Sequence, residues 1–244
     1  LPVILRTTTR INHSSGMISL GPLRPRNTRG VFEKKPFEYV CIPAVSRNLH
    51  PKLLEKIDKA ATMADKSAWN RIEGKGKWGI ICNGVSYGYV SDAITELGAA
   101  DLIKVLRVGF SHPFPENLAR RFLDGCEKVL VVEEGEPCMQ EAVRNCAQRF
   151  GMMVPIHGKG EGLFSRLYEF DPIAVKKVIA SYFNLSFTAP VPIQTDDLPE
   201  VPARPPNLCP GCPHRATYVA IRDVFGDEAI YPTDIGCYTL GLLP

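Results

Sequence analysis

The sequence lacks the features of several large classes of protein. It contains no run of about 18 consecutive apolar residues, which excludes a membrane-spanning helix. Its first ten residues have neither the apolar core nor the small-residue cleavage site of a secretory signal peptide. Lys and Arg (29) nearly balance Asp and Glu (26) without a polybasic stripe, so nothing indicates nucleic-acid binding.

Cysteine is also sparse, at eight residues in 244, which is too few for a secreted disulfide scaffold. Two of the eight lie where small buried thiols are common, because Cys82 is in an apolar run and Cys146 is on the apolar face of a predicted helix. We therefore expect a reducing, cytoplasmic environment. Neither end of the sequence has a capping element, so we expect a piece of a longer polypeptide.

Strand and helix patterns alternate between residues 76 and 183. Continuous apolar runs, typical of parallel strands buried on both faces, lie at 78–82, 102–108, 128–133 and 153–157. Helical patterns fill the gaps at 86–97, 115–125 and 137–150, and a last helix begins at Asp171. This alternation predicts an α/β fold, with a parallel sheet in a three-layer domain.

The segments on either side of this domain have different patterns. Residues 1–45 contain two strand-like runs, at 2–9 and 37–42, and residues 50–69 have the apolar spacing of a helix. Six prolines between residues 184 and 207 exclude helix and strand interiors, so an extended linker is predicted there. The predicted domains are 1–45, 46–183 and 208–244, with the linker at 184–207.

The most specific motif follows the linker. Residues 208–215 read LCPGCPHR and residues 234–241 read DIGCYTLG, so Cys209, Cys212 and Cys237 have the spacing C-x2-C-x24-C. A helix at about 213–225 and a strand at about 229–234 would return the third cysteine to the turn that holds the first two. Iron–sulfur clusters are held by cysteine thiolates, so the motif predicts a cluster or cofactor site.

Three other interpretations of these cysteines stay open. A C-x-x-C pair can be a redox pair, although this one follows a loop and not the strand of a thioredoxin-like unit. Zinc ribbons have two such pairs, whereas this chain has one, to which His214 could add a ligand. The thiols could also be purely structural.

A second motif, Gly84–Gly88, matches the G-x-S-x-G of a hydrolase elbow. It lies between a predicted strand and helix, and Asp124 and His157 follow Ser86 in the order of a catalytic triad. Serine at a strand-to-helix turn is also a good N-cap, and no oxyanion-hole motif is present. The pattern therefore favours a structural turn over a serine hydrolase.

Three further clusters of polar residues give weaker signals. The glycine-rich run at 158–162 lacks the spacing of a P-loop, so it predicts a loop. Glu133 and Glu134 end a predicted strand, where either a ligand site or a solvated turn is expected. Arg6, Arg10 and His13 form a polar group near the N-terminus to which the sequence assigns no purpose.

At the two cysteine motifs, the chain resembles the thiamine-diphosphate subunit of 2-oxoacid:ferredoxin oxidoreductases, and most closely the large (alpha) subunit of the indolepyruvate branch. Residues 5–14 (LRTTTRINHS) resemble the end of that subunit's pyrimidine-binding domain. Residues 80–89 (IICNGVSYGY) resemble the start of its middle domain, which is similar to the C-terminal domain of transketolases. The resemblance covers essentially the whole chain and implies a middle domain flanked by two partial thiamine-binding domains.

The resemblance implies a thiamine-diphosphate-dependent oxidoreductase that oxidatively decarboxylates aryl pyruvates, such as indolepyruvate, to aryl-acetyl-CoA. Mg²⁺ and [4Fe–4S] clusters would be further cofactors, and a beta subunit, coenzyme A and ferredoxin would be partners in an anaerobic organism. Two alternatives stay open, namely a different 2-oxoacid substrate and a non-catalytic module stabilised by zinc or thiols.

The resemblance also implies which residues belong to the cofactor site. These are Cys209, Gly211, Cys212, Pro213, His214, Asp234, Ile235, Gly236, Cys237 and Tyr238. The three cysteines fall on positions that supply cluster ligands in the related pyruvate enzyme, but a [4Fe–4S] cluster normally has four and no cysteine follows Cys237. The family's magnesium motif would lie beyond Pro244, so residues 1–244 alone are expected to be inactive.

Overall fold

The computed structural model describes residues 2–12, 14–22, 32–191, 199, 202–203 and 205–242. The chain divides into two compact units, residues 1–190 and residues 191–244. Within the described ranges, no helix combines the length and the apolar character needed to cross a lipid bilayer. His13, from the N-terminal polar group, lies outside the described residues.

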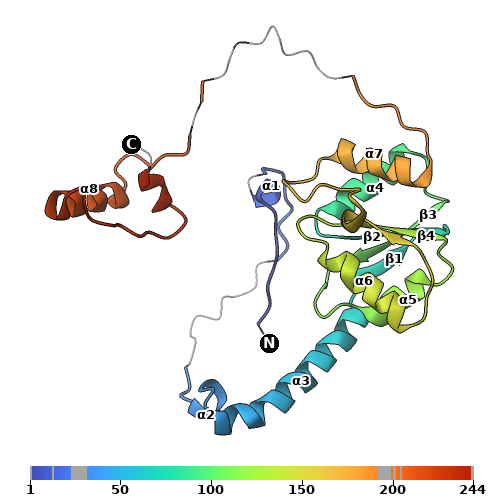
Figure 1. Ribbon diagram of the computed structural model, residues 1–244, viewed down its shortest axis with the longest axis horizontal. Helices are drawn as coiled ribbons and strands as arrows, with labels where there is room; N and C mark the ends of the chain where they lie inside the picture. The colour runs from blue at the N-terminus through green and yellow to red at the C-terminus, as the bar shows by residue number, and fades with distance from the viewer. Residues whose placement is uncertain are drawn as a thin grey trace. The chain divides into compact units, whose positions relative to one another are not determined.

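A five-stranded sheet forms the centre of the first unit (Figure 1). Its order is β1-β3-β2-β4-β5, with β1 antiparallel to β3 and every other pair parallel. The central strands are almost continuously buried, as expected for parallel strands covered on both faces. The strands are β1 (Asn70–Glu73), β2 (Trp78–Asn83), β3 (Ile103–Val108), β4 (Lys128–Val132) and β5 (Ile156–His157).

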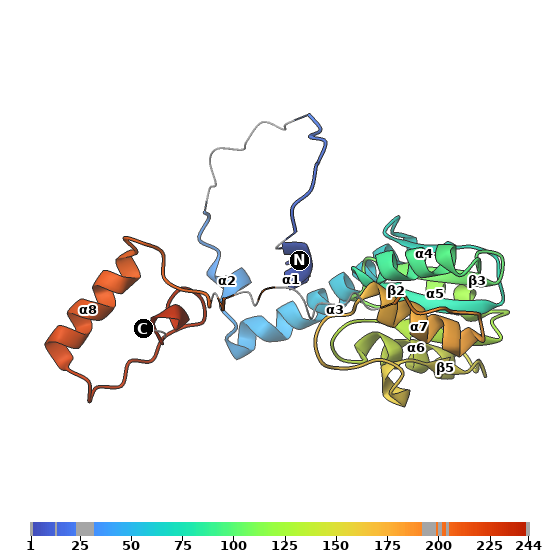
Figure 2. The same ribbon diagram turned by 90° about the horizontal axis from the view of Figure 1, so that it is seen from above.

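Helices cover both faces of the sheet and complete three layers (Figures 1 and 2). On one face, α4 (Ser86–Glu96) and α7 (Pro172–Phe183) pack in the cluster that includes Ile80 and Phe183. On the other face, α5 (Glu116–Leu123) and α6 (Cys138–Arg149) pack around Phe122. The predicted α/β three-layer fold is therefore confirmed.

The connections place a topological switch point between β2 and β4. These strands are parallel neighbours, with Ile80 opposite Leu130. The chain leaves β2 into α4 on one face of the sheet, and it leaves β4 into α6 on the other face. The loops after the two strands diverge, which opens a crevice at the carboxyl edge where α/β proteins bind ligands.

The N-terminal predictions were wrong in secondary structure. Residues 2–8 have no regular structure, and the predicted strands at 2–9 and 37–42 are replaced by the single turns α1 (Thr9–Asn12) and α2 (Pro36–Tyr39). A strand needs a partner for its backbone groups, and no described strand pairs with these segments. The predicted helix at 50–69 runs instead over α3 (Pro43–Lys66), where Pro43 suits the first turn.

Strand β1 was not predicted from the sequence. Its four residues, NRIE, are short and mostly polar, so they give no apolar run. The strand exists because its backbone pairs with the edge of β3, with Asn70 opposite Val108. Asn70 strengthens this edge, because its buried amide binds Ala64 O and Phe110 O (both 2.9 Å) and accepts from Gly109 N (2.8 Å) and Phe110 N (2.7 Å).

The second unit contains α8 (Pro213–Phe225) and the short 3-10 helix η2 (Thr239–Leu242). The helix predicted at 213–225 is confirmed. The strand predicted at 229–234 is wrong, because the described residues of this unit offer it no partner strand. The predicted domain boundaries at 45/46, 183/184 and 207/208 stay predictions.

Candidate functional site

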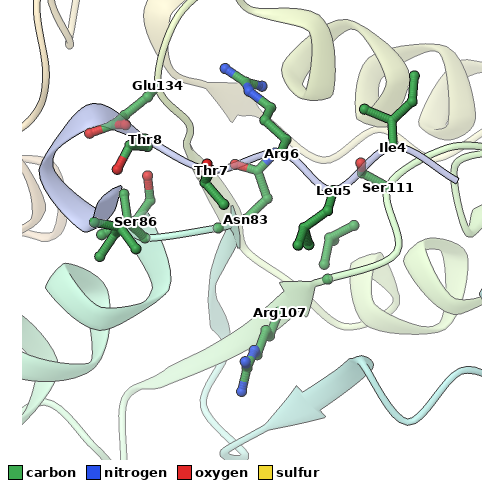
Figure 3. Close-up of a pocket in the computed structure, with 15 residues that line it drawn as sticks. Ile4, Leu5, Arg6, Thr7, Thr8, Asn83, Ser86, Arg107, Ser111 and Glu134 are labelled. Carbon is green, nitrogen blue, oxygen red and sulfur yellow. The ribbon is translucent and has the colours of Figure 1, made fainter. Parts of the chain in front are cut away.

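The carboxyl edge of the sheet holds a cavity of about 430 Å³ (Figure 3). Asn83, at the end of β2, and Gly109, directly after β3, line its base, and Glu134 lines it from the loop after β4. The N-terminal segment crosses this edge and contributes Ile4 to Thr8. The cavity therefore lies at the switch point, between the chain's N-terminal segment and the ends of three neighbouring strands.

Arg10 attaches the N-terminal segment to the α/β domain. Its backbone N–H donates to Glu169 Oε1 (3.0 Å), its guanidinium lies 3.3 Å from Glu169 Oε2, and its Nη1 donates to Tyr89 Oη (3.0 Å) on α4. The pKa of this exposed guanidinium is raised, mainly by its interaction with Tyr89 and to a smaller extent by Glu169. The sequence assigned no purpose to Arg10. In the structure, its contacts hold the N-terminal segment over the edge of the sheet.

The G-x-S-x-G motif forms a structural turn. Gly84 has a φ of +54°, which favours glycine, and Ser86 is the buried first residue of α4. His157 Nδ1 lies 3.0 Å from Tyr182 Oη, and Asp124 accepts a bond from Lys104 through its backbone oxygen. Among the described residues, no hydrogen bond joins Ser86 to His157 or Asp124, so a triad is not assembled.

Glu133 and Glu134 have separate roles. Glu133 is buried, and its carboxylate accepts the N–H groups of Met139 (2.7 Å) and Gln140 (2.8 Å) at the start of α6. Burial raises the pKa of Glu133, and the two backbone hydrogen bonds act against that shift. Glu134 accepts the N–H of Phe170 (2.9 Å) and faces the cavity. The solvated turn considered from the sequence does not describe Glu133.

The glycine-rich run at 158–162 contains Lys159, which interacts electrostatically with both of these glutamates. Lys159 is buried, its Nζ donates to Ser165 O (2.5 Å), and it lies 4.4 Å from the ring centroid of Phe170. Burial lowers the pKa of Lys159. Glu161 accepts the N–H of Gly158 (2.8 Å), so the run forms an internally bonded turn, η1 (Lys159–Glu161).

The first cysteine motif forms a tight turn into α8. Cys212 N donates to Cys209 O (3.1 Å), and Gly211 between them has a φ of +71°. Cys212 is the N-cap, and Pro213 occupies the first helical turn, where its missing N–H costs nothing. Cys212 Sγ lies 3.4 Å from His214 Nδ1.

The second motif returns to the same helix. The rings of His214 and Tyr238 meet edge to face at 4.5 Å, and Tyr218 Oη donates to Tyr238 O (2.6 Å). A Cβ on Gly241 would lie 2.3 Å from the Tyr218 ring, so only glycine fits there. The DIGCYTLG segment therefore contacts α8 through Tyr238, by way of a loop and not a strand. The predicted return of Cys237 to the turn at Cys209–Cys212 stays a prediction.

The cysteines do not form a metal site by themselves. Among the described residues, no group of three His, Cys, Asp or Glu side chains could hold a metal ion. Cys209 and Cys237 are exposed, and three thiols are one fewer than a [4Fe–4S] cluster normally takes. Their assignment as cluster ligands stays a prediction.

Several residues of the cavity belong to segments that the sequence had singled out separately, such as Arg6, Ser86 and Glu134, but nothing in the sequence brought them together. Arg107 and Ser111 belong to no motif. One signal could have found several of them: Asn83 and Ser111 lie at or just beyond the ends of predicted parallel strands, and such ends meet at one edge of a sheet.

Comparisons with known proteins agree with the predicted resemblance. The indolepyruvate oxidoreductase subunit IorA of Methanothermobacter thermautotrophicus is 40% identical over 253 residues, covering 100% of this chain and 40% of that protein. The subunit IorA of Thermococcus kodakarensis is 44% identical over 258 residues, covering 99% of this chain and 39% of that protein. No family model matches the chain.

Two solved structures have partly similar folds. A 2-oxoglutarate:ferredoxin oxidoreductase from Magnetococcus marinus is 21% identical, with a TM-score of 0.41, and covers 58% of this chain and 24% of that one. A split-gene transketolase is 16% identical, with a TM-score of 0.38, and covers 47% of this chain and 41% of that one. The chain spans about two fifths of the length of the curated relatives. Along essentially its whole length, this chain is similar to indolepyruvate oxidoreductase subunits IorA, which confirms the resemblance predicted from its cysteine motifs.

Proposed function

We propose that the protein containing this chain oxidatively decarboxylates aryl pyruvates such as indolepyruvate, with thiamine diphosphate as the cofactor. The observation that carries the proposal is sequence identity: 40–44% of the aligned residues are identical to subunits named indolepyruvate oxidoreductase, and the alignments cover 99–100% of this chain. Both cysteine motifs lie within the matched residues. The relatives are named as oxidoreductases. We extend this to an aryl pyruvate substrate, a CoA product and dependence on thiamine diphosphate.

Thiamine diphosphate would supply the carbanion that attacks the keto carbon and holds the electrons of the broken carbon–carbon bond. The residues of this chain would form one wall of its site. The turn at Cys209–Cys212 and the loop at Asp234–Tyr238 meet at the first turn of α8, where the Tyr238 ring fixes the orientation of His214. These groups would position the cofactor, and the Mg²⁺ ligands would lie outside residues 1–244.

We propose that Cys209, Cys212 and Cys237 shape this wall and do not hold a cluster. Support comes from the turn geometry, in which Cys212 is the N-cap residue of α8 and its sulfur lies beside His214. In the part of the chain that the structure describes, no three His, Cys, Asp or Glu side chains are grouped so as to hold a metal ion. The [4Fe–4S] clusters that pass electrons to ferredoxin would be bound elsewhere in the enzyme. A beta subunit, coenzyme A and a cytoplasmic location complete the proposal.

The test is reduction of methyl viologen by the purified enzyme, with indolepyruvate as substrate and coenzyme A present. We expect reduction to require added thiamine diphosphate and to be faster with indolepyruvate than with pyruvate or 2-oxoisovalerate. Activity without thiamine would refute the proposal, and preference for pyruvate would move it to another 2-oxoacid. Residues 1–244 alone should give no turnover.

The cysteine assignment has its own measurement. The variant Cys209→Ala should keep the iron content and the absorbance at about 400 nm of the reconstituted enzyme, while the KM for thiamine diphosphate rises. Cys41→Ala, at another exposed thiol, is the matched control. Loss of iron in Cys209→Ala alone would show that the motif does ligate a cluster. Stoichiometric zinc without thiamine binding would instead favour the non-catalytic module.

A further inference from the structure

The cavity at the sheet edge is built from residues that the proposed thiamine chemistry does not use. It lies wholly within residues 1–190, whereas the thiamine-site residues belong to the unit at 191–244. It is an open crevice with a volume of about 430 Å³, within the usual range of sites for small organic ligands. It is also at the switch point between β2 and β4, where open α/β sheets bind their ligands.

Two hydroxyl groups at this cavity make no hydrogen bond to any residue that the structure describes. Ser86 is 1% exposed, and in Figure 3 its side chain rises from the start of α4 towards Thr8. Its hydroxyl makes no hydrogen bond to any residue that the structure describes. Thr8 Oγ1 is likewise buried without a partner within the described ranges. Buried hydroxyls are normally hydrogen-bonded, so a pair of unmatched ones at a cavity indicates a missing polar group.

The cavity carries charges of both signs. Arg6 lines it and makes no hydrogen bond to any described residue, but its guanidinium interacts electrostatically with the carboxylate of Glu133. Helix α4, eleven residues long, presents its N-terminus at Ser86, where the helix dipole favours negative charge. Arg107 also lines the cavity, although its guanidinium is stacked 4.4 Å from the ring centroid of Tyr87. Glu134 is the opposing charge, and its carboxylate is engaged with the N–H of Phe170.

The rest of the lining is apolar and is open to solvent on one side. It consists of Ile4, Leu5, Ile11 and Val108, of which Ile4 and Leu5 are 92% and 87% exposed. In Figure 3 these two lie along the N-terminal segment, on the side away from Ser86. A single oxyanion would leave this apolar side unfilled. A ligand with an anionic group at the α4 end and a carbon framework beyond it would satisfy both parts.

We propose that this cavity binds a small organic anion, whose phosphate or carboxylate group lies between Ser86 and Arg6. The site is built from other residues than those of the proposed thiamine site. Because the N-terminal segment forms one wall, a bound ligand would also hold that segment to the sheet edge, together with the Arg10 contacts.

Isothermal titration calorimetry of the purified protein tests the proposal with three probes: adenosine 5′-monophosphate, phenylacetate and inorganic phosphate. We expect one of the two organic anions to bind more tightly than inorganic phosphate, and the tighter of the two identifies the head group. Arg6→Gln should weaken that binding about 10- to 100-fold, the effect of one hydrogen bond to a charged group. Ser86→Ala should weaken it by a smaller factor.

The matched control is Arg121→Gln, which removes the same charge from an exposed position on α5 and should leave binding unchanged. Thermal unfolding of each variant checks that it is folded. The proposal is overturned if no probe binds, if inorganic phosphate binds as tightly as both organic anions, or if Arg6→Gln and Ser86→Ala bind like the unaltered protein. Each of these results is independent of thiamine-dependent activity, so the two proposals can fail separately.

Discussion

Replacing Glu133 by Ala should destabilise the α/β domain more than replacing any surface glutamate. Glu133 is 4% exposed, and its carboxylate accepts two backbone hydrogen bonds, from Met139 at 2.7 Å and Gln140 at 2.8 Å. The change would leave two N–H groups at the start of α6 buried without a partner. Hydrogen bonds to charged groups contribute about 1.5–3 kcal/mol each.

The expected loss is smaller than the sum of two such bonds. Burial raises the pKa of Glu133, because taking the ionised carboxylate out of water costs free energy. Replacing Glu133 by Ala removes this cost together with the two hydrogen bonds. We therefore expect a loss of about 3 kcal/mol in the free energy of unfolding. With a urea dependence of about 2 kcal/mol per molar, the midpoint should fall by about 1.5 M.

Urea unfolding followed by tryptophan fluorescence measures this loss. Both tryptophans lie in the first unit, and Trp78 stacks on Phe183 in its core (5.2 Å between centroids). Glu141→Ala is the control, because this exposed glutamate lies in the first turn of the same helix and contributes about 0.3–1 kcal/mol through the helix dipole. Equal losses in the two variants would refute the capping role of Glu133.

Three other changes test the same structure. Lowering the pH should increase the contribution of Glu133 to stability, because the pKa of its carboxyl group in the folded protein is above the ordinary 4.5. This contribution is complete below about pH 4.5 and is lost as the pH rises through the folded-state pKa. Glu133→Gln should abolish this pH dependence of the urea midpoint. Asn70→Ala should cost about 2–4 kcal/mol, since four hydrogen bonds of the buried amide are lost, and Asn48→Ala on the exposed part of α3 should cost far less. Tyr182→Phe should lower the free energy of unfolding by about 1 kcal/mol, because the hydroxyl donates to Val129 O (3.1 Å) and lies 3.0 Å from His157 Nδ1. Burial raises the pKa of this hydroxyl to about 12. An unchanged unfolding midpoint would contradict this prediction.

The predictable parts of the fold were those whose signal is local. Parallel strands buried on both faces are continuous apolar runs, so β2, β3 and β4 were predicted within a residue or two of their observed ends. Helix α8 was predicted with its exact observed bounds, since Pro213 begins it and Gly226 follows it. The parts that failed depend on partners: β1 is a strand only because β3 pairs with it, and residues 229–234 are not a strand because no described segment pairs with them.

The sequence by itself determined the fold class, the likeness to 2-oxoacid oxidoreductase subunits and the residues of the proposed thiamine wall, because apolar periodicity and the spacing C-x2-C-x24-C are written in consecutive residues. Only the tertiary structure decided that Glu133 caps α6, that Ser86 opens a helix without a triad, and that residues 4–8 cross the sheet edge. These results depend on strands that are distant in sequence ending at one edge. Their side chains meet through the order β3-β2-β4, which hydrogen bonding between strands sets and no local pattern records.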